Sequence, residues 1–448
     1  MISFVDLINL TFVLFIVFLF YSFKKIDLRE SLVFFVLILI SVFIYVFYPL
    51  ELIFPDQKIY LNCVQEIRSA LYDMRAYDCI DEQAQESFAS KAIERFSLIF
   101  ALIPIPFYYS TLSGALANKI FILFFYIFIS KKYFQKTLLL FFIPSLMLFS
   151  SLFLKETLAI LVLISGMAGA FHNKKIIFFI CISLLILIKI QAAFFLFIFG
   201  IAALLQKIFF GRKKTAMIAI FSLMLIMLSV EDKLIDKIND YVYIFSVNAI
   251  KTGGISEQEF EVNSTESLSS ISKENKINPL FSECIVLNLS RNQCKTHINT
   301  WESSNLNLHL LTLEEIKNKR ASLDQNMIIK NPRNILIKDF TVEYKGYFEI
   351  IKNSPNFIVR GAMSPGHSDI KIQLIAFIEK LMLIALFVYY LLNSTKELHA
   401  PVIIFCLSSN MILGLIIFNQ GTLWRYTMPI FISAIFLTQI KKTKDLSV

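Results

Sequence analysis

The sequence predicts an all-α protein held in a membrane by about eleven transmembrane helices. Hydrophobic residues make up 56% of the 448 positions and charged residues 17%, which is below the roughly 25% charged residues of soluble domains. Apolar runs of about 18 residues recur along the chain, and a helix of that length crosses a bilayer core of about 30 Å. Short basic clusters separate these runs, a pattern typical of cytoplasmic connections.

The net charge of +9 does not indicate nucleic-acid binding, because the basic residues follow the predicted membrane helices. They gather in short connections such as Lys131–Lys132 and Lys174–Lys175. The two long hydrophilic segments, 51–95 and 231–368, instead contain more acidic than basic residues. The positive-inside rule therefore predicts that the short basic connections are cytoplasmic and that both long segments lie outside.

This orientation divides the chain into five parts. Pro104 and Pro106 make a straight helix unfavourable after the first outer segment, so we expect an interfacial or re-entrant segment there. The first apolar run follows Met1–Asp6, which lacks basic residues, and is expected to be a membrane helix. The parts are 1–50 with helices 1 and 2, 51–113 with the first outer loop and the re-entrant segment, 114–230 with helices 3 to 8, 231–368 with a large and mainly helical extracytoplasmic loop domain, and 369–448 with helices 9 to 11 and a short cytoplasmic tail.

Two apolar regions are too long for single membrane spans. Thr137–Phe171 would measure about 52 Å as one helix and Lys175–Gln206 about 48 Å, at 1.5 Å per residue. Because the bilayer core is only about 30 Å thick, each region is predicted to fold as a hairpin. Lys155-Glu156 lies at the turn of the first hairpin, and Lys189-Ile190-Gln191 at the turn of the second. Both turns are expected to face outward, since the ends of both hairpins carry basic residues.

Cysteine positions agree with this orientation. Cys63 and Cys79 share the first outer loop, and Cys284 and Cys294 share the second. Pairs of cysteines in outer segments are what an oxidising exterior allows, so we predict two disulfides.

The candidate site residues are polar side chains that this topology brings to the outer membrane surface. Several of them are cations, and arginine and lysine suit a ligand that carries phosphate. A carboxylate at the same level could deprotonate a sugar hydroxyl. The residues are Asp56, Lys155, Glu156, Lys189, Gln191, Arg360, His367, Asn419, Gln420 and Arg425.

Structural roles stay open for each of these candidates. Lys155 and Lys189 could simply extend their charged ends to water from hairpin turns. Arg425 lies between Trp424 and Tyr426, which are typical of the membrane interface. Asp56 is one of several acids in its loop, and His367 could be an ordinary surface histidine.

Other chemistries lack their motifs. The chain has no Walker A, GxGxxG, GxSxG, HExxH or CxxC pattern, and its five histidines show no zinc-binding spacing. We therefore expect no metal, no cofactor and no coupling to ATP within this chain.

Three segments resemble bacterial polysaccharide-biosynthesis membrane proteins. They are Pro144–Glu156 with its Pro-Ser, Ser-Ser and Leu-Lys-Glu groups, Phe357–Pro365 before a late membrane helix, and Asn419–Pro429 with its Asn-Gln-Gly-Thr and Arg residues. The family includes O-antigen and capsule repeat-unit polymerases and the related C-type membrane glycosyltransferases. Unlike the family pattern, the first outer loop follows helix 2 and contains no doubled Asp-x-Asp, which leaves the catalytic base open between Asp56 and Glu156.

The resemblance implies a glycosyltransferase of the bacterial inner membrane that joins oligosaccharide repeat units linked to polyisoprenyl pyrophosphate. It implies O-antigen, lipopolysaccharide or capsule biosynthesis, with a chain-length regulator or flippase of the same pathway as partner. In this role the cations Lys155, Lys189, Arg360 and Arg425 would bind the pyrophosphate. Glycan contacts would fall to Gln191, His367, Asn419 and Gln420. The alternatives are a C-type transferase using a polyisoprenyl-phosphate sugar, a polyisoprenoid-glycan transporter or flippase, and a non-catalytic assembly component.

Overall fold

The structure is a computed structural model, and within the residues that it describes every regular element is a helix. This confirms the predicted all-α class. The only strand-like pairing in those residues is an isolated bridge between Phe134 and Ile440. The described residues are 3–48, 56–73, 79, 88–135, 137–211, 233–240, 346–363, 370–394, 396–416 and 420–441.

The chain forms two compact units. The first comprises Met1–Ala216, Met382–Cys406 and Met428–Val448, and the second comprises Met217–Leu381 and Leu407–Thr427.

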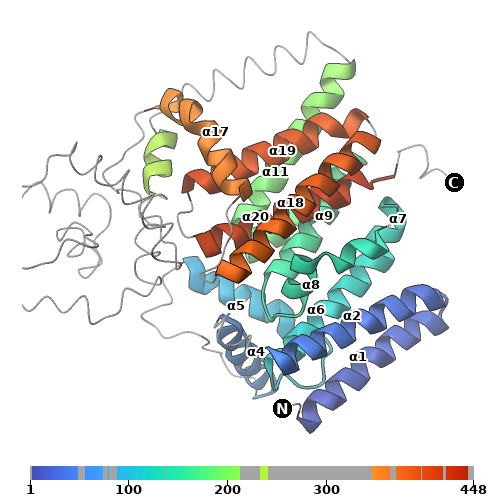
Figure 1. Cartoon of the computed structure of the whole chain (residues 1–448). Coiled ribbons are helices and arrows are strands. Elements are labelled where there is room, and N and C mark those ends of the chain that lie inside the picture. The colour runs from blue at the N-terminus through green and yellow to red at the C-terminus, as the bar shows by residue number, and fades with distance from the viewer. Residues whose placement is uncertain are drawn as a thin grey trace, which may run out of the picture. The chain divides into compact units, whose positions relative to one another are not determined.

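The first unit begins with α1 (Phe4–Ser22) and α2 (Leu28–Phe47), which pack against each other (Figure 1). Both begin with capping boxes. The side chain of Ser3 or Asp27 accepts a hydrogen bond from the backbone N–H three residues later, and the acidic side chain of that later residue accepts one from the backbone N–H of Ser3 or Asp27. Apolar side chains nevertheless cover nearly the whole circumference of both helices, and only 22% of each apolar window is buried. Helices that are apolar all round and yet exposed suit contact with lipid.

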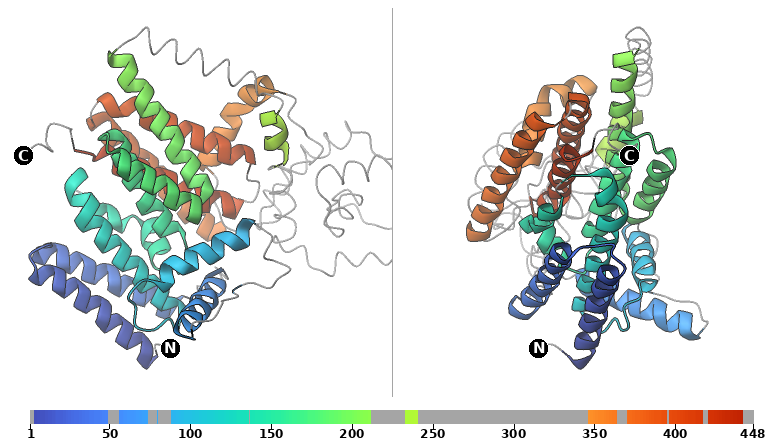
Figure 2. Two further views of the ribbon diagram at one scale, coloured as in Figure 1. Left: turned by 180° about the vertical axis from the view of Figure 1, so that it is seen from behind. Right: turned by 90° about the vertical axis from the view of Figure 1, so that its right-hand side faces the viewer.

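A helical pair, α4 (Asp56–Asp73) and α5 (Phe88–Ala101), packs together in the predicted first outer loop (Figure 2). Here the predicted disulfide between Cys63 and Cys79 is present. The other predicted pair, Cys284 and Cys294, lies outside the described residues.

The proline-containing segment after α5 is held by Arg68. Its guanidinium donates to the carbonyl oxygens of Ala101, Ile103 and Ile105, at 3.0, 2.5 and 2.6 Å. It also lies 4.5 Å from the ring centroid of Tyr108. Burial raises the pKa of Tyr108 above its usual range, while the charge of Arg68 opposes that rise. The side chain of Arg68 thus supplies the donors that an irregular backbone needs.

The centre of the first unit is α6 (Thr111–Phe125), which continues through η2 (Tyr126–Ser130) into α7 (Lys131–Tyr133). The next elements are η3 (Leu138–Phe142), α8 (Pro144–Ser150), α9 (Glu156–Phe171), α10 (Lys175–Ile188) and α11 (Ile190–Gly211). The last three of these pack side by side (Figure 2). The carboxyl-terminal part of α20 (Gln420–Thr438) belongs to this unit, where Phe436 contacts Phe125.

Among the described residues, four helices are long and apolar enough to cross a membrane. Shorter apolar helices, such as α9 and α10, accompany them. The expected helix at 215–230 lies outside the described residues, and the count of about eleven spans stays a prediction. The four long helices are Phe4–Ser22, Leu28–Phe47, Thr111–Tyr133 and Lys396–Leu415.

The second unit includes a helix at 233–240, α17 (Tyr347–Met363) and parts of α18 (Ile370–Asn393), α19 (Lys396–Ile416) and α20. Its apolar cluster comprises Ile235, Ile350, Phe357 and Leu415. The helices at 233–240 and 346–363 fall within the predicted outer loop domain 231–368, whose remaining residues lie outside those described.

Candidate functional site

The candidate site surrounds a break between two helices, α8 and α9 (Figure 1). Pro144 occupies the first turn of α8, where its missing N–H costs nothing. The helix ends at Ser150 because the hydroxyls of Ser150 and Ser151 both donate back to the Met147 carbonyl oxygen. Residues 151–155 are non-helical, and α9 starts at Glu156. The segment Pro144–Glu156 therefore contains an interrupted helix.

Polar side chains from other helices satisfy the backbone of this break. Asn118 of α6 donates to the Leu152 carbonyl oxygen at 2.7 Å. The side-chain carbonyl oxygen of Gln57, Oε1, accepts from the backbone N–H of Phe153 at 2.9 Å. The hydroxyl of Ser41 on α2 lies 2.8 Å from that of Ser151. Non-helical backbone inside an apolar bundle is tolerated where protein groups satisfy it. Here α4 and α6 bond to the backbone of the break, and α2 bonds to the Ser151 hydroxyl.

Lys119 of α6 lies directly behind the break. Its side chain is buried, with the residue 2% exposed, and Nζ donates to Ser150 Oγ at 2.5 Å. No carboxylate of the described residues lies within ion-pair distance of this ammonium. Sequence analysis missed Lys119 and Asn118, although a lysine inside an apolar helix is itself a signal of a functional site.

The predicted hairpin turns meet through an ion pair. Lys189 lies between α10 and α11, and its Nζ is 3.4 Å from Glu156 Oε1. Both residues are buried, at 6% and 1% exposure. Pairing reduces the cost of burying each charge. The structure thus brings together two of the residues that sequence length alone assigned to separate turns.

Three further candidates belong to the first unit. Lys155 immediately precedes α9 and is partly exposed. Asp56 begins α4, is partly exposed and adjoins Gln57, which bonds to the break. Gln191 is the second residue of α11 and is partly buried.

The remaining candidates belong to the second unit. Arg425 lies in the first half of α20 and is partly buried, Arg360 lies in α17, and Gln420 begins α20. His367 and Asn419 lie outside the described residues. The expected meeting of Arg360 and Arg425 with Lys155 stays a prediction.

The second unit has a buried cation of its own. Lys380 of α18 is fully buried, and its Nζ donates to Thr427 Oγ1 at 3.1 Å. Thr427 lies two residues after Arg425 on α20. Sequence analysis missed Lys380 as well. Within the described part of the chain, no group of three or more His, Cys, Asp or Glu side chains could hold a metal ion.

Comparisons with protein families, curated proteins and solved structures find no match for this chain.

Proposed function

We propose that this protein is a glycan polymerase that joins oligosaccharide repeat units carried on polyisoprenyl pyrophosphate, at the outer face of the bacterial inner membrane. One observation carries the proposal: cations gather at interrupted helices within an apolar bundle. Lys119, Lys155 and Lys189 lie at or behind two helix breaks, and Glu156 forms an ion pair with Lys189.

A positively charged centre among apolar helices suits a lipid-linked pyrophosphate. Burying a cation in a membrane costs several kcal/mol, about 2.5–3.5 on insertion scales, and such residues are retained mainly for function. The start of α9 adds the positive end of a helix dipole at the same break. A substrate with an isoprenoid tail and a pyrophosphate would supply both the apolar surface and the negative charge that this centre matches.

In the proposed reaction, Asp56 takes the proton of an acceptor sugar hydroxyl. The hydroxyl oxygen then bonds to the anomeric carbon from the face opposite the leaving group, which inverts that carbon. The bond to the lipid pyrophosphate breaks, and its electron pair goes to the phosphate oxygen. Lys155 would stabilise the developing negative charge, and Lys119 and Lys189 would add positive potential in the same unit. Arg360 and Arg425 stay the further pyrophosphate ligands that the sequence predicts.

The geometry favours Asp56 over Glu156 as the base. Glu156 is 1% exposed and already paired with Lys189, so a sugar hydroxyl cannot reach it without displacing the residues that cover it. Asp56 is partly exposed at the start of α4. We therefore assign Glu156 to holding Lys189, and keep Gln191, His367, Asn419 and Gln420 as the glycan contacts.

The proposal is tested by measuring polymer chain length in cells. Lys155→Met and Arg425→Ala should abolish long polymer and leave single-unit glycolipid, because each removes positive charge from the leaving group. Lys132→Met is the matched control, since Lys132 is an exposed lysine on α7. A normal ladder of chain lengths in both site variants, at wild-type protein level, would exclude the mechanism.

A second candidate function is a polyisoprenoid-glycan transporter. Two interrupted helices beside buried charges favour it, because transporters often build substrate sites from discontinuous helices. A transporter would move the lipid-linked unit across the bilayer without lengthening the glycan. A C-type transferase, the other enzymatic alternative, would add one sugar and produce no ladder.

A further inference from the structure

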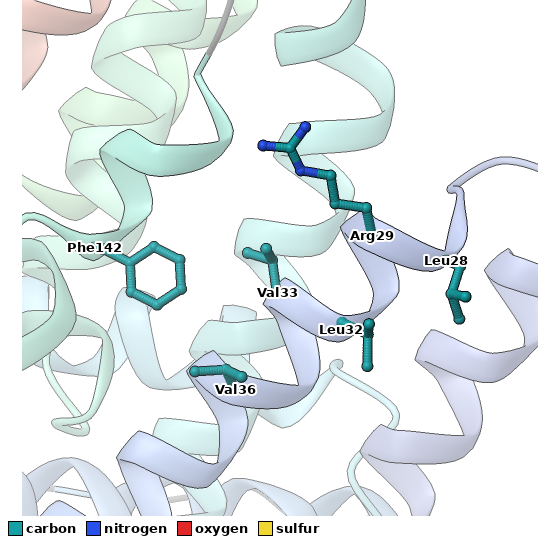
Figure 3. A pocket seen from close by; sticks show the side chains of 6 residues that line it. All are labelled: Leu28, Arg29, Leu32, Val33, Val36 and Phe142. Carbon is teal, nitrogen blue, oxygen red and sulfur yellow. The ribbon is translucent and has the colours of Figure 1, made fainter.

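The first unit contains an apolar groove far along α2 from the helix break. It lies between the first half of α2 and η3, and Figure 3 shows Val33 and Val36 facing Phe142 across it. The groove has a volume of about 470 Å³, which is within the usual range for ligand pockets. It is lined by Leu28, Arg29, Leu32, Val33, Val36 and Phe142.

Arg29 is the one charged residue lining this groove, and its guanidinium extends away from α2 (Figure 3). The carboxylates beside it are already engaged. Asp27 accepts from the backbone N–H of Glu30 at 2.7 Å, and Glu30 accepts from Lys131 Nζ at 2.5 Å. Among the described residues, no carboxylate lies within ion-pair distance of Arg29 itself. The positive charge of Arg29 can therefore pair with an anion from outside the chain.

We propose that this groove binds an anionic phospholipid, with the phosphate on Arg29 and an acyl chain against Val33, Val36 and Phe142. The guanidinium offers a planar pair of donors that matches phosphate oxygens. From Arg29 to Val36 the helix rises about 10 Å, so an acyl chain that starts at the phosphate runs along the apolar residues.

Charge complementarity selects a lipid over other occupants. The exposed residues Lys24 and Lys25 precede the same end of α2, and clusters of basic residues at the end of a membrane helix attract anionic headgroups. A partner helix would cover the apolar residues but leave Arg29 without a counter-charge. The site is independent of the proposed glycan chemistry, because it shares no residue with the helix break.

Binding of dioleoylphosphatidylglycerol to the purified full-length chain, measured by native mass spectrometry, tests this proposal. Dioleoylglycerol, which lacks the phosphate, should bind about tenfold more weakly, the effect of losing one charge-assisted hydrogen-bonded contact. Arg29→Gln should weaken phosphatidylglycerol binding by a similar factor. Lys25→Gln is the matched control, because Lys25 is a nearby exposed cation outside the groove lining.

A further variant tests the apolar part of the groove separately from the charge of Arg29. Val36→Trp should fill the groove and weaken phosphatidylglycerol binding while Arg29 remains. Helix content by circular dichroism should stay at the wild-type value in every variant, since all three positions are exposed. Equal losses in Arg29→Gln and Lys25→Gln, equal binding of dioleoylglycerol, or unchanged binding in Val36→Trp would each overturn the proposal.

Discussion

Around the described helix break, buried charges are held in two different ways. Glu156 and Lys189 neutralise each other at 3.4 Å. Lys119 has a hydroxyl partner, Ser150, and no described carboxylate. In a low-dielectric interior a paired charge can serve the fold alone, whereas a lone cation is difficult to explain by stability. The site hypothesis therefore depends more on Lys119 than on the ion pair.

The ion pair can be tested through protein stability. Glu156→Leu should destabilise the fold by about 3–5 kcal/mol, because it leaves Lys189 buried without its partner. Adding Lys189→Met should recover most of that loss, since both charges are then gone. The measurement is thermal or denaturant unfolding in detergent. Equal and additive losses from the two single substitutions would show that the pair is not coupled.

Length and charge predicted some site residues and not others. Lys155, Glu156 and Lys189 were predictable because they interrupt apolar regions too long for one span. Lys119 lies in a run of ordinary membrane length, so no length anomaly marked it. Arg68 was missed because its partners are backbone carbonyls about 35 positions away, which no local pattern reveals.

Among the helices, the break between α8 and α9 is held by close packing as well as hydrogen bonds. The ring of Phe153 packs among aromatic rings of α4, α5 and the following loop, with centroids 5.1 Å from Phe100 and 5.9 Å from Tyr108. On its other side lies Gly114 of α6, where a Cβ atom would come within 2.0 Å of the Phe153 ring. Glycine allows α6 to approach the non-helical segment, as small residues do between membrane helices.

Gly114→Val should therefore separate α6 from the break. We expect a loss of stability of about 1–3 kcal/mol or more from overpacking, together with loss of polymer, because Lys119 and Asn118 lie one turn further along α6. Thermal unfolding and the chain-length ladder are the measurements. The double variant Gly114→Val/Phe153→Ala removes the clash and should unfold closer to the wild-type temperature. Wild-type stability in Gly114→Val would contradict this packing.

At the scale of the whole molecule, composition was enough to predict the helical class. In the part of the chain that the structure describes, four helices have the length and apolarity of membrane spans. The spans themselves were predicted less well. The hairpin regions contain helices as short as 7 and 14 residues, in α8 and α10, because serines and lysines interrupt them. Hydropathy cannot locate such interruptions when the partners that satisfy them come from distant helices.

The predicted orientation places the Cys63–Cys79 disulfide outside and Lys132 inside. After mild reduction of intact spheroplasts, a membrane-impermeant maleimide should label Cys63 and Cys79. A cysteine introduced by Lys132→Cys, in a chain lacking the other cysteines, should react only after the membrane is permeabilised. Labelling of the Lys132→Cys variant in intact spheroplasts would reverse the orientation and move the helix break to the cytoplasmic half.

Elongation by the purified chain tests the central claim most directly. The full chain would be reconstituted in liposomes with a polyisoprenyl-pyrophosphate-linked repeat unit, and products would be separated by size. We predict glycans of two or more repeats, released polyisoprenyl pyrophosphate in equal number to the new linkages, and neither product with Lys155→Met. Translocation or single-sugar addition without any joined repeats, by protein that is folded and active in that assay, would contradict the polymerase.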